Sequence, residues 1–281
     1  MAKLLVFGAG YSGLAIAAQA ASADFAVTVT SRSAGAAVSG VRVVPFEAAQ
    51  DSIEAADFLV STAAPGEDGD PVLARWSDVI AASPARWLGY LSTTGVYGNR
   101  DGGWVDEATP PAPGSGRSRR RLAAEEAWVR AAAGRPTDLI RLAGIYGPGR
   151  SALDDVRAGR ARRVIKPGHA FGRIHRDDIA AGVLAALAHP PEGTRVLNFS
   201  DDLPAESALV LEEAARLLGV APPPAVPFDE AWGGMSEMGR SFWAENRKVA
   251  NAATKAALHL AWRYPSYREG LAVILAGERA G

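Results

Sequence analysis

The chain has 281 residues, 48% of them hydrophobic, and a formal net charge of −1, which is the composition of an ordinary globular protein. It contains no cysteine, and its four histidines show no i, i+4 pairing, so we expect neither disulfides nor a metal site. The near-zero charge argues against nucleic-acid binding, and no apolar run reaches the ~20 residues of a membrane span. With a first strand at the very N-terminus in place of a signal peptide, the expected location is cytoplasmic.

The first thirty residues predict strand, glycine turn, helix and strand in that order. A helix that begins at a glycine turn points free backbone N–H groups and the positive end of its dipole at a phosphate. Gly8 permits the tight turn, Gly10 the close approach of a diphosphate, and Gly13 the close packing of helix on strand. The alternative is a structural turn that binds nothing. We predict a dinucleotide site at Gly8, Gly10, Tyr11, Ser12 and Gly13.

The end of the second strand favours NADP over NAD. Turns that bind NAD place an acidic residue about 20 positions past the glycines, where its carboxylate binds the ribose 2′-hydroxyl. This chain has Ser31-Arg32-Ser33 there, without an acid nearby. Arg32, with the hydroxyl of Ser31 beside it, suits a 2′-phosphate. The alternative interpretation of Arg32 is a solvated loop arginine.

Strands and helices alternate through the first two hundred residues, which predicts a parallel sheet with helices on both faces. The expected strands are residues 4–7, 26–30, 41–46, 57–62, 86–92, 137–142 and 194–198. Helices are expected at residues 71–82, 117–133 and 205–218. The predicted fold class is therefore α/β, a Rossmann-type doubly wound and mostly parallel sheet of about seven strands.

The pattern changes after residue 200, where a proline run at 222–227 precedes a segment with tryptophan and methionine at 232–243. We expect these residues to form a smaller C-terminal substrate lobe over the carboxyl edge of the sheet. The predicted division is a dinucleotide-binding domain of residues 1–150 and 171–200 and a substrate-side lobe of residues 151–170 and 201–281.

Several ordered motifs reach the carboxyl edge of the sheet, where ligands bind in open α/β folds. They are Ser92-Thr93-Thr94-Gly95-Val96-Tyr97-Gly98, Arg141-Leu142-Ala143-Gly144-Ile145-Tyr146-Gly147-Pro148, Ile174-His175-Arg176-Asp177-Asp178 and Tyr264-Pro265-Ser266-Tyr267. Together with the glycine turn they resemble the extended short-chain dehydrogenase/reductase superfamily, in its branch of NAD(P)-dependent epimerases and dehydratases, over nearly the whole chain. The resemblance is closest to atypical bacterial members with Gly-Trp-Val-Asp-Glu after the fifth strand, here residues 103–107.

The resemblance implies roles for particular residues. Thr93 falls where the family has its catalytic serine or threonine, which hydrogen-bonds the reacting oxygen. Ala63 and Ala64 would pass along the cofactor after the fourth strand. Gly144 and Ile145 would border the nicotinamide. Members of this family often dimerise through helices that flank the basic helix, so a homodimer is a further expectation of the resemblance.

The chain departs from the family at its acid/base pair. Relatives carry Tyr-x-x-x-Lys before a Leu-Ala-Ala-Glu-like helix, and anchoring on residues 122–125 places Arg117 at the tyrosine and Arg121 at the lysine. Arginine keeps its proton near neutral pH, so Arg117 cannot act as a general acid/base. Arg121 could still hold the ribose or stabilise negative charge. The catalytic candidates are therefore Thr93, Arg117 and Arg121, and the alternative for the arginines is a solvated helix face.

Basic residues also gather between Arg150 and Arg176, with Asp154 and Asp155 as the only acids in the first part of that stretch. A small anionic ligand, bound bidentately by arginine, is the interpretation we favour. His175 is a second candidate acid/base, although a packed core histidine is the favoured interpretation.

Three functions remain open on the sequence alone. The favoured one is an NADP-binding oxidoreductase or isomerase of the extended type, acting on a small anionic substrate with non-standard catalytic residues. The second is a catalytically inactive NADP-binding sensor or regulatory protein. The third is a sugar-nucleotide epimerase or dehydratase that uses a displaced base.

Overall fold

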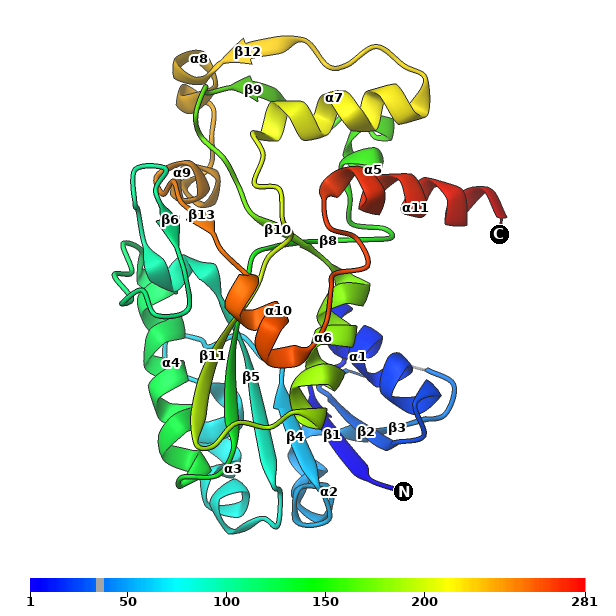
Figure 1. Cartoon of the computed structure of the whole chain (residues 1–281), viewed down its shortest axis with the longest axis vertical. Helices are drawn as coiled ribbons and strands as arrows, with labels where there is room; N and C mark the ends of the chain where they lie inside the picture. Colours follow the sequence, from blue (N-terminus) through cyan, green and yellow to red (C-terminus); the bar gives the residue numbers. More distant parts are fainter. Residues whose placement is uncertain (34–37, 281) are drawn as a thin grey trace.

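A seven-stranded sheet forms the centre of the protein, whose computed structural model describes residues 1–33 and 38–280 (Figure 1). All its strands are parallel, in the order β11-β7-β5-β4-β1-β2-β3. They are β1 (Lys3–Phe7), β2 (Ala26–Ser31), β3 (Val41–Pro45), β4 (Phe58–Ser61), β5 (Trp87–Thr93), β7 (Thr137–Leu142) and β11 (Thr194–Phe199). The strand order reverses between β1 and β4, so a crevice opens beyond the carboxyl ends of these two strands.

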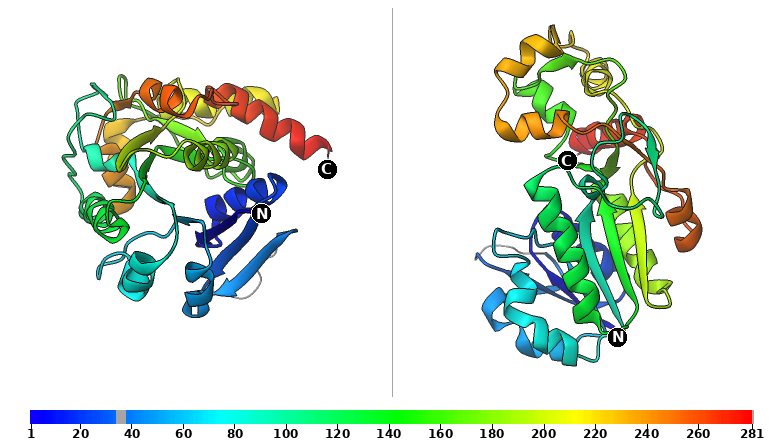
Figure 2. Two further views of the ribbon diagram at one scale, coloured as in Figure 1. Left: turned by 60° about the horizontal axis from the view of Figure 1, so that its bottom comes forward. Right: turned by 90° about the vertical axis from the view of Figure 1, so that its left-hand side faces the viewer.

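Helices cover both faces of the sheet. One layer holds α1 (Tyr11–Ser22) and α6 (Arg176–Ala188), and the other holds α2 (Gln50–Glu54), α3 (Pro71–Ala82) and α4 (Gly116–Ala132). Figure 2 shows the sheet between these layers from two further directions. The predicted Rossmann-type fold is confirmed, and the sheet is parallel throughout.

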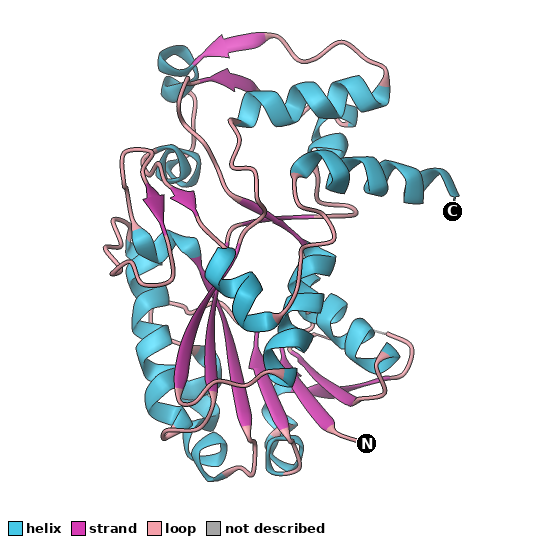
Figure 3. Cartoon of the chain, viewed as in Figure 1, coloured by secondary structure: helices cyan, strands magenta, loops and turns pink. Residues whose placement is uncertain are grey.

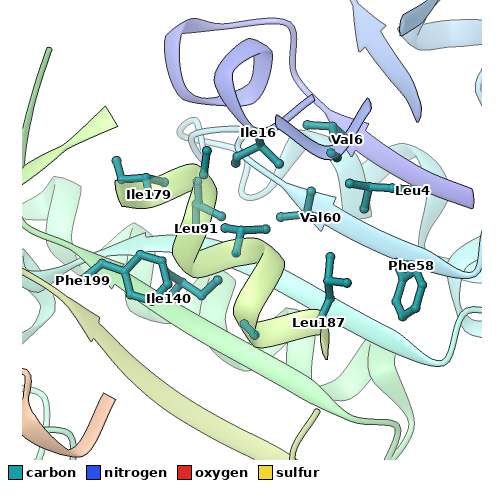
Figure 4. Packing of buried hydrophobic residues seen from close by; sticks show 14 of the residues in the cluster. Leu4, Val6, Ile16, Phe58, Val60, Leu91, Ile140, Ile179, Leu187 and Phe199 are labelled. Atoms are coloured by element: carbon teal, nitrogen blue, oxygen red, sulfur yellow. The ribbon is translucent and has the colours of Figure 1, made fainter. Parts of the chain in front are cut away.

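Successive side chains of the strands pack alternately into two separate hydrophobic cores, one on each face of the sheet. Leu4 and Val6 of β1 point to the α1 and α6 face, whereas Leu5 and Phe7 point to the α3 and α4 face. Figure 4 shows the first of these clusters, in which Ile16 lies among residues from several strands and from α6. Burial on both faces explains why these strands are almost continuously apolar.

A smaller group of elements lies beyond the carboxyl ends of the strands (Figures 1 and 3). Its helices are α5 (Ala152–Arg157), α7 (Ser207–Leu218), α8 (Phe228–Gly233), α9 (Glu237–Trp243) and α11 (Tyr267–Ala280). Three two-stranded parallel pairs accompany them: β8 (Gly144–Tyr146) with β10 (Arg173–His175), β9 (Arg163–Ile165) with β12 (Ala225–Pro227), and β6 (Trp104–Val105) with β13 (Lys248–Val249). Short 3-10 turns occur at η1 (Phe46–Ala48) and η2 (Thr94–Tyr97).

The helix α10 (Ala252–Leu258) returns to the large sheet, next to β11 and α6. Leu258 and the following Trp262 join the apolar cluster that α1 and α6 cover. The division of the chain into two lobes that we expect from the sequence stays a prediction. In the described part of the chain, no helix has both the length and the apolar character that crossing a bilayer requires.

Local signals fix where the helices begin. Pro71 opens α3, and the side chain of Asp70 accepts hydrogen bonds from the N–H groups of Val72 and Leu73 at 2.9 and 3.0 Å. Ser115 caps α4 by accepting from Ser118 N at 3.1 Å. The predicted 71–82 helix matches α3, and α4 lies one residue earlier at each end than predicted.

A buried ion pair joins α4 to the sheet. Arg141 on β7 donates to both carboxylate oxygens of Glu125, at 3.1 and 2.8 Å, and the two side chains are only 4% and 2% exposed. Ser92 Oγ donates to the same carboxylate at 2.5 Å. The three groups satisfy one another inside the protein, so removing Glu125 or Arg141 leaves a buried charge without its partner.

We expect Glu125→Gln to lower the free energy of unfolding by about 3 kcal/mol, because Arg141 would lose its counter-charge. Urea unfolding followed by tryptophan fluorescence measures this. The matched control is Glu47→Gln, which removes the exposed ion pair between Glu47 and Arg75 and should cost less than about 1 kcal/mol. Equal effects of the two substitutions would contradict the special role of the buried pair.

Candidate functional site

The glycine turn between β1 and α1 leaves the beginning of the helix open. Gly8 has φ +114°, which favours glycine, and a Cβ there would lie 2.5 Å from Thr62 Oγ1. A Cβ on Gly13 would lie 1.9 Å from the carbonyl oxygen of Gly8, so only glycine permits this close packing. Gly10 has open space around its Cβ position, and none of the described side chains caps α1. The helix therefore offers unpaired N–H groups to a ligand beside Gly10.

Further predicted site residues follow the carboxyl ends of β2 and β4, at the same edge of the sheet as the glycine turn. The exposed side chain of Arg32 follows directly after β2, where Ser31 Oγ donates to the carbonyl of Ser33 at 2.7 Å. After β4 come Ala63, which is half-buried, and Ala64, which is exposed. These residues lie along the path from the glycine turn that a dinucleotide follows in Rossmann folds.

A cavity of about 580 Å³ opens next to the glycine turn, at the carboxyl ends of β5 and β7. It brings together predicted site residues from distant parts of the chain: Ser12, Thr93, Arg117, Arg121, Gly144 and Ile145. Phe171, Phe242 and Trp243 form an apolar part of its wall. The remaining predicted site residues are not part of this lining: Gly8, Gly10, Tyr11, Gly13, Ser31, Arg32, Ala63 and Ala64. A volume of this size suits a small molecule.

Arg121 is bound tightly to the strand ends. Its Nη1 donates to the carbonyls of Ala63 and Leu91 at 3.2 and 2.9 Å and to the hydroxyl of Tyr90 at 3.0 Å. Burial raises the pKa of Tyr90, so that its hydroxyl stays neutral. The guanidinium thus has a structural task, and Arg121 also lines the cavity.

Two hydroxyl groups flank Gly95 at the floor of the cavity. A Cβ on Gly95 would lie 2.9 Å from Ser118 Oγ and 3.3 Å from Thr93 Oγ1. Thr93 accepts from Gly95 N at 3.1 Å, and Ser118 accepts from Ser115 Oγ at 3.0 Å. Within the described part of the chain no acceptor takes the proton of either hydroxyl, so both can donate to a ligand oxygen.

Ser118 is a site residue that the sequence reasoning missed. It follows Arg117 directly, but its burial and its place opposite Thr93 depend on how α4 packs against η2. The signal available in the sequence was the pair of serines, Ser115 and Ser118, at the start of the basic helix. We interpreted that helix only through its arginines.

The charges around the cavity are mostly positive. The guanidinium of Arg117 is exposed, and among the described residues it has neither a hydrogen bond nor an ion pair. Arg150, Arg173 and Arg247 also line the cavity. Glu245 is the one carboxylate among the described lining residues, and it is already paired with Arg247 at 2.7 Å. The cavity therefore suits an anion.

His175 is buried away from this cavity. Its Nδ1 accepts from Asp177 N at 3.1 Å, which caps α6, and its ring packs against Tyr146 and Tyr264. Burial lowers its pKa to about 4, so the ring is neutral near pH 7. Within residues 1–33 and 38–280, no group of His, Asp and Glu side chains could hold a metal ion.

Comparison with known proteins finds a match over part of the sequence and several structures of the same fold. Protein YeeZ of Escherichia coli strain K12 is 33% identical over 139 residues, 48% of this chain and 47% of YeeZ. The match therefore spans about half the length of this curated relative. No protein-family model matches the chain.

A functionally unknown conserved protein from Silicibacter pomeroyi DSS is 40% identical, with a TM-score of 0.91 over 99% of both chains. MoeE5, solved with UDP-glucuronic acid and NAD, is 19% identical, with a TM-score of 0.83 over 99% of this chain and 100% of its own. The human epimerase family protein SDR39U1 (isoform 2), solved with NADPH, is 20% identical, with a TM-score of 0.75 over 98% and 99%.

The fold is that of the extended short-chain dehydrogenases/reductases, which confirms the fold that the resemblance in the sequence implies. The chain belongs to the same family as the Silicibacter protein, with which it shares 40% of its residues over the full length. The two likenesses at or below 20% identity establish the fold alone.

The glycine turn offers a paired test. Gly10→Ala adds a methyl group to open space at a φ of −89° that alanine accepts, so we expect normal thermal stability but about tenfold or more weaker NADPH binding. Gly13→Ala instead drives a methyl group into the Gly8 carbonyl and should cost about 1–3 kcal/mol of stability. Calorimetry and thermal melts distinguish them. Wild-type affinity in Gly10→Ala would show that no ligand approaches this turn.

Proposed function

We propose that this protein is an NADP-dependent oxidoreductase, or a related isomerase, of the extended short-chain dehydrogenase/reductase type that acts on a small anionic substrate. The observation that supports this most strongly is the single cavity that joins the glycine turn, through Ser12, to Thr93 and to a wall rich in arginine. A cofactor and an anion would meet there, at the carboxyl edge of the sheet.

The described residues fit a nicotinamide dinucleotide. The open N-terminus of α1 beside Gly10 would hold the diphosphate, and Gly144 and Ile145 would border the nicotinamide. Arg32 and Ser31 would bind a 2′-phosphate, which favours NADP. The cofactor, when bound, would supply hydride transfer. Similar proteins solved with NAD or NADPH support the cofactor class.

The arginines would recognise the anionic group of the substrate. The Arg117 guanidinium has no ion pair or hydrogen bond among the described residues, and Arg117 lines the cavity. Arg173 lines the same space with its Nη1 held by the carbonyls of Phe171 and Ala205 at 2.9 and 3.0 Å. Such fixed donors bind a carboxylate or phosphate through charge-assisted hydrogen bonds. The Phe171, Phe242 and Trp243 wall would exclude water from the other side of the substrate.

Thr93 and Ser118 would bind the reacting oxygen between them. Both hydroxyls have a proton to donate, and Thr93 and Ser118 line the same cavity as Gly144 and Ile145. Donors fixed before the reaction stabilise the charge that develops on an oxygen. Arg121 would add positive charge from the other side and hold the ribose through the N–H groups that its contacts with the strand ends leave over.

A sensor that binds NADP without turnover is the second candidate. Arginine at the position of the family's catalytic tyrosine favours it, because Arg117 cannot exchange a proton with the substrate near neutral pH. A sugar nucleotide is a further anionic substrate that this cavity would attract. MoeE5 was solved with UDP-glucuronic acid, but at 19% identity that likeness carries no substrate argument.

The cofactor preference is tested at Arg32. We expect calorimetry to show that wild-type protein binds NADPH at least about tenfold more tightly than NADH, because a 2′-phosphate gains charge-assisted hydrogen bonds. Arg32→Ala should remove this preference by weakening NADPH alone. Arg42→Ala, on the neighbouring strand β3, is the control and should change neither affinity. Equal binding of both cofactors by the wild type would contradict the assignment of NADP.

The substrate site is tested with carbonyl compounds. We expect NADPH oxidation with a panel of 2-oxo acids and little with their neutral methyl esters. Arg117→Gln should lower kcat/KM for an active acid by about tenfold or more, since a charge-assisted bond is lost. Arg120→Gln, in the same basic run but outside the cavity lining, is the matched control. Thr93→Ala should lower kcat.

Turnover that survives both Arg117→Gln and Thr93→Ala would show that the catalytic site is assigned wrongly. Tight NADPH binding without turnover of any anionic carbonyl compound, in either direction, would favour the sensor instead.

A further inference from the structure

Arg150 lines the candidate site, but the proposed function gives it no role in binding the cofactor or the substrate. Its side chain is exposed, and within residues 1–33 and 38–280 its guanidinium has no ion pair and no hydrogen bond. It nevertheless lines the 580 Å³ cavity and a second cavity of about 450 Å³ that adjoins it. The two cavities share Ile145, Tyr146 and Arg173 as well, so Arg150 lies where they meet.

A tight turn holds Arg150 in place. Gly147 and Arg150 exchange backbone hydrogen bonds, N–H to carbonyl in both directions, at 3.1 and 3.0 Å. The turn is packed directly on the first residue of α1, since Tyr11 Oη donates to the carbonyl of Pro148 at 3.0 Å. A Cβ on Gly147 would lie 2.5 Å from Tyr11 Oη, so this approach requires glycine. The Gly147–Arg150 turn, which belongs to the connection between β8 and α5, is thus in direct contact with Tyr11 beside the glycine turn.

Two arginines lie beside the ring of Tyr11, and the carboxylates of Asp177 and Asp154 also act on its hydroxyl group. The guanidinium carbons of Arg150 and Arg176 lie 5.7 and 5.0 Å from the centre of its ring. Arg176 is paired with Asp177 at 3.2 Å, whereas Arg150 has no ion-pair partner in the part of the chain that the structure describes. The first turn of α1 contains no acid. A cation placed beside the positive end of a helix dipole is unfavourable unless an anion lies between them.

We propose that Arg150 binds the bridging diphosphate of the dinucleotide, from the side opposite the N-terminus of α1. The inference rests on the proposed cofactor site. Ser12, the second residue of α1, lines the same cavity as Arg150, so one ligand can contact both. The Tyr11–Pro148 contact positions Arg150 for this role. The diphosphate is then held by backbone N–H groups on one side and by a guanidinium on the other.

The test measures binding only and needs no substrate. NADPH is titrated by calorimetry into wild-type protein, Arg150→Gln and the matched control Arg162→Gln, an exposed arginine of the same basic stretch that lines neither cavity. We expect about tenfold weaker binding for Arg150→Gln, a shallower dependence of its affinity on salt, and no change for Arg162→Gln. Tyr11→Phe, which removes only the contact with Pro148, should cost a smaller factor.

A second probe separates the diphosphate from the rest of the cofactor. Adenosine 2′-monophosphate carries the adenosine end without the bridging diphosphate, so Arg150→Gln should bind it as the wild type does. Thermal melts without ligand should nearly coincide for Arg150→Gln and wild type, since among the described residues the Arg150 guanidinium has no hydrogen bond or ion pair to lose, only its ring contact with Tyr11.

The outcomes distinguish this inference from the proposed function. If wild-type protein binds neither NADPH nor NADH, the proposed function fails. If it binds NADPH and Arg150→Gln does so equally well, only the role of Arg150 is overturned. Equal loss for NADPH and adenosine 2′-monophosphate, or equal loss in Arg162→Gln, also overturns it. If Arg150→Gln impairs only the turnover of an anionic carbonyl compound, Arg150 belongs to the substrate site.

Discussion

The buried ion pair between Glu125 and Arg141 is the constraint on which the candidate site depends. Two charges that are almost completely removed from water must meet with good geometry, because the desolvation of each is repaid only by the other. This requirement fixes the height and rotation of α4 against β7. The N-terminal part of the same helix carries Arg117, Ser118 and Arg121. Their positions at the cavity are therefore set by the Glu125–Arg141 ion pair, which lies one or two helical turns further along α4.

Polar contacts carry this constraint across the sheet to the end of the chain. The guanidinium of Arg141 stacks on Tyr97, 4.7 Å from the ring centre, and Tyr97 donates to Asn198 Oδ1 at 2.8 Å. The backbone N–H of Asn198 donates to Thr254 Oγ1, and that hydroxyl donates to the carboxylate of Glu107. The helix α10 and the residues after β5 are thus tied to one buried network, with every member satisfied by its neighbour.

The sequence was sufficient for the seven strands and the glycine turn, because buried parallel strands are apolar runs and Gly8 to Gly13 combine spacing with context. It was insufficient for the strand pairs of two or three residues, such as β6 with β13, which are too short to show a period. Nor could it show that Arg121 is bound to strand-end carbonyls, or that the hydroxyls of Ser118 and Thr93 both lie next to Gly95. Those facts depend on tertiary packing between distant segments.

The outer wall of the cavity has a consequence for how the protein is made. Phe242, Trp243 and Arg247 come from a late segment, and Asn251 reaches back to the carbonyl of Ser200 at 2.7 Å. Chains fold from the N-terminus during synthesis on the ribosome. A nascent chain of some two hundred residues already contains the whole sheet and the glycine turn, but it lacks this wall. The glycine-turn side of the cavity can therefore form before the wall with Phe242 and Trp243 exists.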